Sequence, residues 1–165
     1  MNYRALIAVT IVLLIASVCR ADVVLPDVIS DAMVLQREQP VPIWGKAEPG
    51  EAVTVSFAGQ TKKTTADKDG QWRVTLDPMR ASATPAVLII AGKNRIELKD
   101  ILVGEVWLVS GQSNMQLILS QTANGEAVIA AANHPLLRLF NVSRQVAFKH
   151  KIGRASCRER VYVLV

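Results

Sequence analysis

The sequence predicts a mixed β and α/β fold, with an antiparallel β-sandwich at residues 22–100 followed by the start of an α/β domain at residues 101–150. Two observations carry this prediction. Apolar and polar residues alternate with period two up to about residue 100, which places the apolar side chains on one face of half-buried strands. Beyond that point the pattern changes to a nearly continuous apolar stretch, which is typical of a strand covered on both faces.

Three segments of the first domain show the alternation clearly, at residues 53–57, 71–76 and 96–99. The turn signals around them are Pro49-Gly50, Ala58-Gly59, Asp69-Gly70 and Gly92-Lys93-Asn94. Short strands separated by turns at this spacing favour an antiparallel sandwich over a parallel sheet with helices. About eighty residues are enough for one small core.

The second domain is expected in the order strand, turn, helix, strand. The segments are apolar strand residues 101–103 and 106–109, a tight turn at 110–114, a helix at about 115–132 that Asn124-Gly125 interrupts, and a strand at 136–140. This order begins an α/β domain. One such unit cannot bury both faces of its sheet, so we expect the domain to be incomplete in this chain.

The first 21 residues predict a secretory signal peptide. Arg4 precedes a charge-free apolar run at residues 5–18, which is too short to span a bilayer comfortably, and cleavage is expected after Ala21. We therefore expect a secreted or periplasmic protein that leaves the membrane after cleavage. An uncleaved membrane anchor and lipidation of Cys19 are the alternatives.

The net charge of +5 does not predict a nucleic-acid surface, because it lies at the two ends of the chain. The expected signal and residues 151–165 carry all of the excess, so residues 22–150 are neutral. The two cysteines, Cys19 and Cys157, also lie at the ends, so residues 22–150 contain no cysteine. Neither a disulfide nor thiolate chemistry is expected in that part of the chain. Residues 151–161 match the conceptual translation of a common sequencing adapter. We expect residues 151–165 to be an artefact tail, with a genuine basic segment as the alternative.

The segment with the most chemical information is Gly104-Glu-Val-Trp-Leu-Val-Ser-Gly-Gln-Ser-Asn-Met115. Ser113 follows the apolar strand and opens the expected helix, and Gly111 permits the sharp bend between them. This position presents the hydroxyl at the carboxyl end of a strand, where open α/β sheets bind ligands, and N–H groups at the helix start can stabilise an oxyanion. Serine is also a common helix N-cap, and the geometry alone favours that simpler role.

The same segment resembles the nucleophile block of the sialate O-acetylesterases, within the SGNH hydrolases. It differs from the Gly-x-Ser-x-Gly elbow of α/β-hydrolases, because Met115 replaces the second glycine. Other segments resemble the family in the same order: Leu25-Pro-Asp, Met33-Val-Leu-Gln36, Val41-Pro-Ile-Trp-Gly45, Pro49-Gly-Glu51, Asp69-Gly-Gln-Trp72 and His134-Pro-Leu-Leu-Arg-Leu-Phe140. The resemblance covers nearly all of residues 25–148.

The resemblance implies a β-sandwich followed by an SGNH-type esterase domain. It makes Ser113 the nucleophile that attacks an acetyl ester of sialic acid or of another acetylated sugar, with its own backbone N–H in the oxyanion hole. The residues that would support the loop are Gly111, Gln112 and Asn114. Family members often carry a glutamate and an aromatic residue where this chain has Gln116 and Leu117. The difference leaves the assignment of Ser113 unchanged but bears on substrate preference near the helix start. No cofactor is implied.

A serine nucleophile needs a histidine base that an acid orients. The family's histidine stands in an Asp-x-x-His block far beyond the nucleophile, and this chain ends before it. His134 lacks the acid, since Ala131 stands three residues earlier, so we expect it to be a loop residue. The chain is therefore expected to be an inactive part of an active parent. The alternative is a carbohydrate-binding sandwich module with a non-catalytic hydrolase stub.

Two other groups of residues have simpler interpretations. Asp67 and Asp69 before Gly70 resemble the start of a calcium loop, but the later ligand positions hold Gln71 and Arg73 and no glutamate follows. A hairpin turn is therefore expected. Trp44, Trp72 and Trp107 could stack on sugars, but their apolar strand positions favour the core. The sequence has no phosphate loop, dinucleotide fingerprint or metal-ligand cluster, so no metal or cofactor is expected. The resemblance implies an acetylated sugar as the partner.

Overall fold

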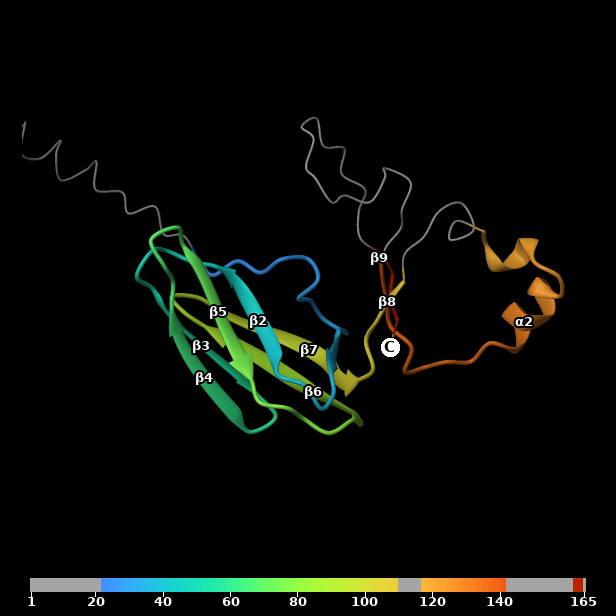
Figure 1. Cartoon of the computed structure of the whole chain (residues 1–165), viewed down its shortest axis with the longest axis horizontal. Helices are drawn as coiled ribbons and strands as arrows, with labels where there is room; N and C mark the ends of the chain where they lie inside the picture. The colour runs from blue at the N-terminus through green and yellow to red at the C-terminus, as the bar shows by residue number, and fades with distance from the viewer. Residues whose placement is uncertain (1–21, 110–116, 142–161, 165) are drawn as a thin grey trace, which may run out of the picture.

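The structure is a computed structural model that describes residues 22–109, 117–141 and 162–164. This part of the chain is mostly β-strand (Figure 1). The strands are β1 (Val34–Gln36), β2 (Val41–Lys46), β3 (Ala52–Phe57), β4 (Gln60–Thr65), β5 (Gln71–Leu76), β6 (Ser82–Ala91), β7 (Arg95–Gly104), β8 (Trp107–Val109), β9 (Leu139–Asn141) and β10 (Tyr162–Leu164). The 3-10 helix η2 (Leu119–Gln121) and the α-helix α2 (Gly125–Ala131) lie between β8 and β9.

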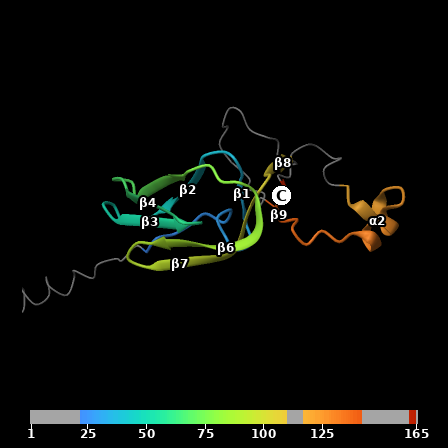
Figure 2. The same cartoon turned by 90° about the horizontal axis from the view of Figure 1, so that it is seen from below.

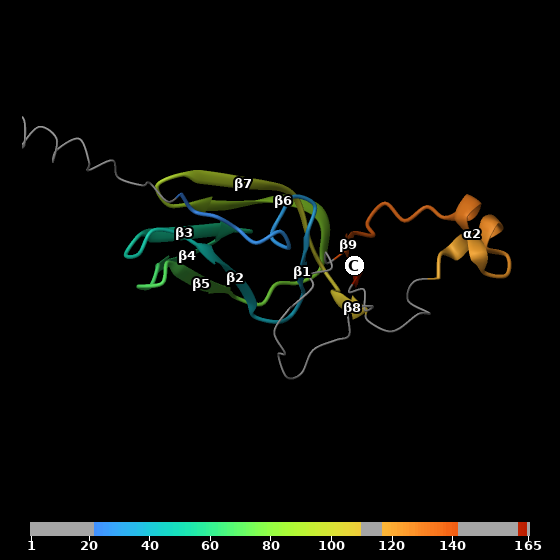
Figure 3. The ribbon, with the colours of Figure 1, turned by 90° about the horizontal axis from the view of Figure 1, so that it is seen from above.

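Two sheets surround the N-terminal core. The larger one has the strand order β1-β7-β6-β3-β4, and β2 pairs with β5 in a separate two-stranded sheet. β1 runs parallel to β7, and the other pairs of these two sheets are antiparallel. Figures 2 and 3 show the larger sheet curled, with β6 and β7 on one side of the core and β3 and β4 on the other, beside the sheet of β2 and β5. The expected β-rich half is thus confirmed, whereas its arrangement as a sandwich stays a prediction.

The period-two alternation decides which side chains fill this core. The buried residues are Val53, Val55 and Phe57 on β3 and Trp72, Val74 and Leu76 on β5, as the pattern predicts. Leu88 and Ile90 of β6 belong to the same cluster and have no exposed surface. The apolar strand expected at residues 101–103 is also buried, at the end of β7. Each such side chain contributes about 1.5–3 kcal/mol by leaving water, so the core is the main source of stability.

The turns form where the glycine signals predict them. Ala58 (φ 47°) and Gly59 (φ 79°) join β3 to β4 with both residues in the left-handed region, as a two-residue hairpin turn requires. Before β5, Asp67 Oδ1 accepts the N–H groups of Asp69 at 2.9 Å and of Gln71 at 2.8 Å. Asp67 therefore closes a tight turn, but this turn is not the expected hairpin, because β4 and β5 belong to different sheets. Nowhere in the described ranges do three or more His, Cys, Asp or Glu side chains group so that they could hold a metal ion.

β7 passes through the expected domain boundary at residues 100–101 without a break. Where β6 and β7 pair, two steps along β6 correspond to three along β7, so β7 carries one additional residue. Asp100 lies in this bulge with a left-handed φ of 58°. The bulge places Asp100 beside the downstream segment of the chain, to which it bonds.

The downstream segment contains less helix than the sequence predicts. In place of a helix over residues 115–132, the described part has the short helix η2 and then α2, which begins at Gly125. Asn124 has a left-handed φ of 60° immediately before it. The Asn124-Gly125 step therefore starts the helix instead of interrupting one. The strand expected at residues 136–140 is also shorter and later, as β9.

The last strands form a sheet in the order β8-β10-β9. β10 is antiparallel to both neighbours, so β8 and β9 run in the same direction without pairing to each other. β10 belongs to residues 151–165, the expected artefact tail, of which residues 151–161 and 165 lie outside the described residues. The expected signal peptide at residues 1–21 also lies outside them, and both it and the α/β domain stay predictions. No helix in the described ranges is long and apolar enough to cross a membrane.

Candidate active-site region

Ser113, the expected nucleophile, lies outside the described residues. The same holds for the expected loop residues Gly111, Gln112 and Asn114. The structure describes β8, the strand that leads to them, and resumes at residue 117. β8 follows β7 after Glu105 and Val106, so the contacts of these two residues fix where the strand begins.

Gln36, the last residue of β1, holds this connection through its side chain. Its side-chain Oε1 accepts the N–H of Val106 at 2.9 Å, and its Nε2 donates to Glu105 Oε2 at 3.0 Å. β1 also pairs with the end of β7, where Gln36 lies opposite Gly104. One side chain therefore binds a backbone group and a carboxylate on consecutive residues, about 70 positions further along the chain.

Arg37 adds a second contact to the same carboxylate. Its Nε donates to Glu105 Oε1 at 2.5 Å, and its backbone N–H donates to the carbonyl of Gly104 at 2.9 Å. Hydrogen bonds from Gln36 and then Arg37 lower the pKa of the Glu105 carboxyl, and the bond to Glu105 raises the pKa of the Arg37 guanidinium. Both charged side chains are well exposed, so the pair orients the connection more than it stabilises the fold.

We call these contacts of Gln36 and Arg37 with Glu105 and Val106 the Gln36 anchor. The sequence does not predict it, although residues 33–36 and the segment before Ser113 both resemble the same family. No periodicity links positions so far apart, and a polar residue at the end of a short strand is ordinarily solvated. Only the parallel pairing of β1 with β7 brings the two segments together.

β8 is much more exposed than the sequence predicts. Trp107 is 63% exposed and Leu108 is 74% exposed, so the expectation of a strand covered on both faces is wrong here, as is the expected core position of Trp107. Other large apolar side chains downstream are exposed too: Leu117, Ile118, Leu119, Val128, Ile129, Leu136, Leu137 and Leu139. A surface so rich in apolar groups is typical of a segment that packs against further protein.

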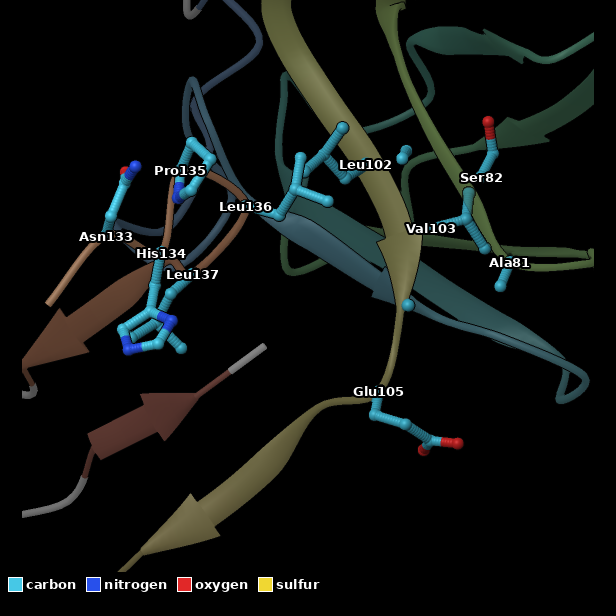
Figure 4. A pocket seen from close by; sticks show the side chains of 12 residues that line it. Ala81, Ser82, Leu102, Val103, Glu105, Asn133, His134, Pro135, Leu136 and Leu137 are labelled. Atoms are coloured by element: carbon cyan, nitrogen blue, oxygen red, sulfur yellow. The ribbon is translucent and has the colours of Figure 1, made fainter.

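A cavity of about 760 Å³ lies where the downstream segment meets the end of β7 (Figure 4). Its lining comes from residues 81–83, 102–105 and 133–137. Leu136 points toward Leu102 in Figure 4, and His134 lies apart from both. His134 is in the turn before β9, where its carbonyl accepts the N–H of Leu137 at 3.0 Å. The expectation of a loop residue is therefore confirmed, and the cavity is mainly an apolar one.

Arg138 ties this turn to β7. Its Nη2 donates to Asp100 Oδ2 at 3.0 Å, and its Nη1 donates to the carbonyl of Pro135 at 2.5 Å. Asp100 is the left-handed residue of the β7 bulge, so the bulge decides where the carboxylate meets the arginine. Arg138 thus fastens the turn before β9 to β7, and the Gln36 anchor fastens the residues before β8 to the end of β1.

No family model matches this chain. Over 127 residues it is 39% identical to the sialate O-acetylesterase of Mus musculus and 37% identical to that of Homo sapiens, and each match covers 70% of this chain and 24% of the relative. Among solved structures it is similar to a carbohydrate acetylesterase from Xanthomonas citri, with a TM-score of 0.61 and 38% identity over 68% of this chain and 26% of that one. The chain therefore spans about a quarter of the length of these relatives.

Proposed function

Because this chain belongs to the sialate O-acetylesterase family, we propose that it is the N-terminal part of a secreted serine esterase. The longer protein would remove O-acetyl groups from sialic acid or from other acetylated sugars. The observation that carries this proposal is the identity to proteins named sialate O-acetylesterase, together with the likeness to a carbohydrate acetylesterase of known structure. Both activities are those of the relatives, and they are proposed here for the longer protein.

In the proposed reaction, Ser113 Oγ attacks the acetyl carbonyl carbon. The new Oγ–carbon bond forms, the bond from that carbon to the sugar oxygen breaks, and the Oγ proton passes through a histidine base to the sugar oxygen. Water then attacks the acyl-enzyme by the same route and releases acetate. The backbone N–H of Ser113 would stabilise the oxyanion in both steps. The residues that would shape the loop are Gly111, Gln112 and Asn114.

The Gln36 anchor supports this proposal from the described residues. It fixes the two residues immediately before β8, and β8 leads to Ser113. A catalytic group has to be held within roughly 0.5 Å of its productive position, which requires rigid support. The N-terminal domain would supply that support, as a packed base for the strand that presents the nucleophile.

We propose further that the present chain has no esterase activity alone. Ser113 needs a base, and the one histidine of the described residues, His134, lies in a turn with an alanine three residues before it. The exposed apolar side chains of β8 and α2 also need further protein to cover them. Residues 22–150 should therefore hydrolyse p-nitrophenyl acetate no faster than their Ser113→Ala variant. A robust rate that depends on Ser113 would contradict this and make His134 the first candidate for the base.

Acetate release by the longer protein tests the proposed substrate class. We expect release from O-acetylated sialic acid or from an acetylated neutral sugar, measured with matched concentrations of both. No release from any acetylated sugar would contradict the esterase proposal. Binding of these sugars without release would favour the alternative, a carbohydrate-binding module with a non-catalytic hydrolase stub.

A further inference from the structure

One tryptophan of the N-terminal domain is exposed where the sequence predicts a core residue. Trp44 of β2 is 42% exposed, whereas Trp72 of β5 is 3% exposed. Strand alternation explains the difference, because Val41, Ile43 and Gly45 occupy the buried face of β2 and Trp44 therefore faces outward. The core prediction is right for Trp72 and wrong for Trp44.

Trp44 lines a hollow of about 510 Å³ on the two-stranded sheet. The lining residues are Pro42, Trp44, Asp67, Gln71, Trp72 and Arg73. Arg73 of β5 is the register partner of Trp44. Residues that lie opposite each other on antiparallel strands share a face, so the side chains of Trp44 and Arg73 project from the same outer surface into this hollow.

The backbone beneath this hollow is held firmly. A Cβ at Gly45 would overlap the carbonyl oxygen of Val24 and would lie 2.9 Å from Trp72 Cζ2, so Trp72 and Val24 pack directly against the strand there. Lys46 and Val24 also exchange two backbone hydrogen bonds of 2.8 Å. These contacts fix β2 immediately after Trp44 without burying its ring, which leaves an aromatic surface toward solvent on a firmly held strand.

The groups in the hollow fit an acidic sugar. The indole of Trp44 offers a broad apolar face against which a pyranose ring can pack, with a polar edge for water or hydroxyl groups. Arg73 forms no ion pair with any residue that the structure describes, so its planar guanidinium can bind a carboxylate through two hydrogen bonds. Asp67 uses Oδ1 for the two N–H groups of its turn, which leaves Oδ2 to accept sugar hydroxyls.

We propose that this outer face of β2 and β5 is an accessory binding site for an acidic sugar unit of a glycan. Trp44 is the platform on which the ring stacks, and Arg73 binds the carboxylate. The choice of a sugar rests on the proposed function, but the site lies on strands other than the one that leads to Ser113. Binding there would keep the longer protein on a glycan while the acetyl groups of that glycan are removed.

Calorimetric titration of the chain with sialyllactose and with lactose tests the site. We expect sialyllactose to bind about tenfold more tightly, because lactose lacks the carboxylate that a charge-assisted hydrogen bond from Arg73 would recognise. Trp44→Ala should lose binding of both sugars, and Trp44→Phe should keep part of it. Arg73→Gln should remove the preference for sialyllactose and leave the weak binding of lactose.

Trp107→Phe is the matched control, since it changes the other exposed tryptophan and should bind as the unchanged chain does. Circular dichroism checks folding, and Arg73→Gln provides a second test if Trp44→Ala does not fold. No binding of either sugar, or undiminished binding by folded Trp44→Ala, would overturn the site. Neither result would affect the esterase proposal, which is tested separately by acetate release from the longer protein.

Discussion

Protonation of the Glu105 carboxylate at low pH should weaken the Gln36 anchor before β8. Hydrogen bonds from Gln36 and Arg37 lower the pKa of its carboxyl below the ordinary value of 4.5. A carboxyl with a lowered pKa binds fewer protons in the folded chain than in the unfolded one. Its stabilisation is therefore present above the unfolded pKa and is lost as the pH falls through the folded value.

We expect Glu105→Gln to have a small effect on the melting temperature near neutral pH, because the carboxylate is exposed. The variant should, however, lose less stability than the unchanged chain when the pH falls from about 5 to about 3. Thermal unfolding across this range measures the difference. Glu97→Gln is the control, since Glu97 is an exposed carboxylate of β7 that bonds to Arg95 at 2.8 Å. Identical pH profiles for Glu105→Gln and the unchanged chain would contradict the expected role.

The elements of the N-terminal half could be predicted from the sequence because independent local signals agree there. Alternation identifies β3 and β5, and the Ala58-Gly59 pair supplies the left-handed turn that joins β3 to β4. The Gln36 anchor and the β7 bulge could not be predicted, because they depend on the pairing of strands far apart in the sequence. Trp44 shows a further limit: an apolar residue type does not reveal which face of its strand meets the core.

The downstream segment has less helix and less buried surface than the sequence predicts, for a different reason. Apolar residues at helical spacing predict a helix over residues 115–132, yet α2 has only seven residues and exposes Val128 and Ile129. Short helices gain most of their stability from packing an apolar face, and this one has none of its large apolar residues buried. Trp107 is exposed for the same reason, because most of its apolar surface is not packed against residues that the structure describes. Sequence patterns predict burial only where a complete core is present, so they fail in this segment.

Arg138 should control how firmly this downstream segment is attached. We expect Arg138→Ala to raise amide hydrogen exchange at residues 133–141 and to leave β3 and β5 unchanged, because the lost bonds to Asp100 and Pro135 are local. The melting temperature should change little, since partly exposed ion pairs contribute about 0–1 kcal/mol. Arg95→Ala, which removes an exposed pair within β7, is the control. Unchanged exchange at residues 133–141 would contradict the attachment.

The whole molecule combines a packed β-rich domain with a downstream segment that is fastened to it at two points. The proposal of a secreted protein rests on residues 1–21, which lie outside the described residues. Expression in a secreting host with this leader should give a mature chain that begins at Asp22, because the apolar run is short and small residues follow it. Intact mass spectrometry measures the terminus. Retention of Met1 or a lipid on Cys19 would contradict the expected cleavage.

The central claim is that Ser113 of the longer protein is a nucleophile and not only a helix cap. Deacetylation rate and melting temperature, measured together on the longer protein and its Ser113→Ala variant, separate the two roles. A nucleophile predicts a loss of rate on the order of 10⁶-fold with little change in stability, since replacing a capping serine costs about 1 kcal/mol. If Ser113→Ala keeps a substantial fraction of the rate and loses only some stability, Ser113 is a cap and the proposed mechanism is wrong.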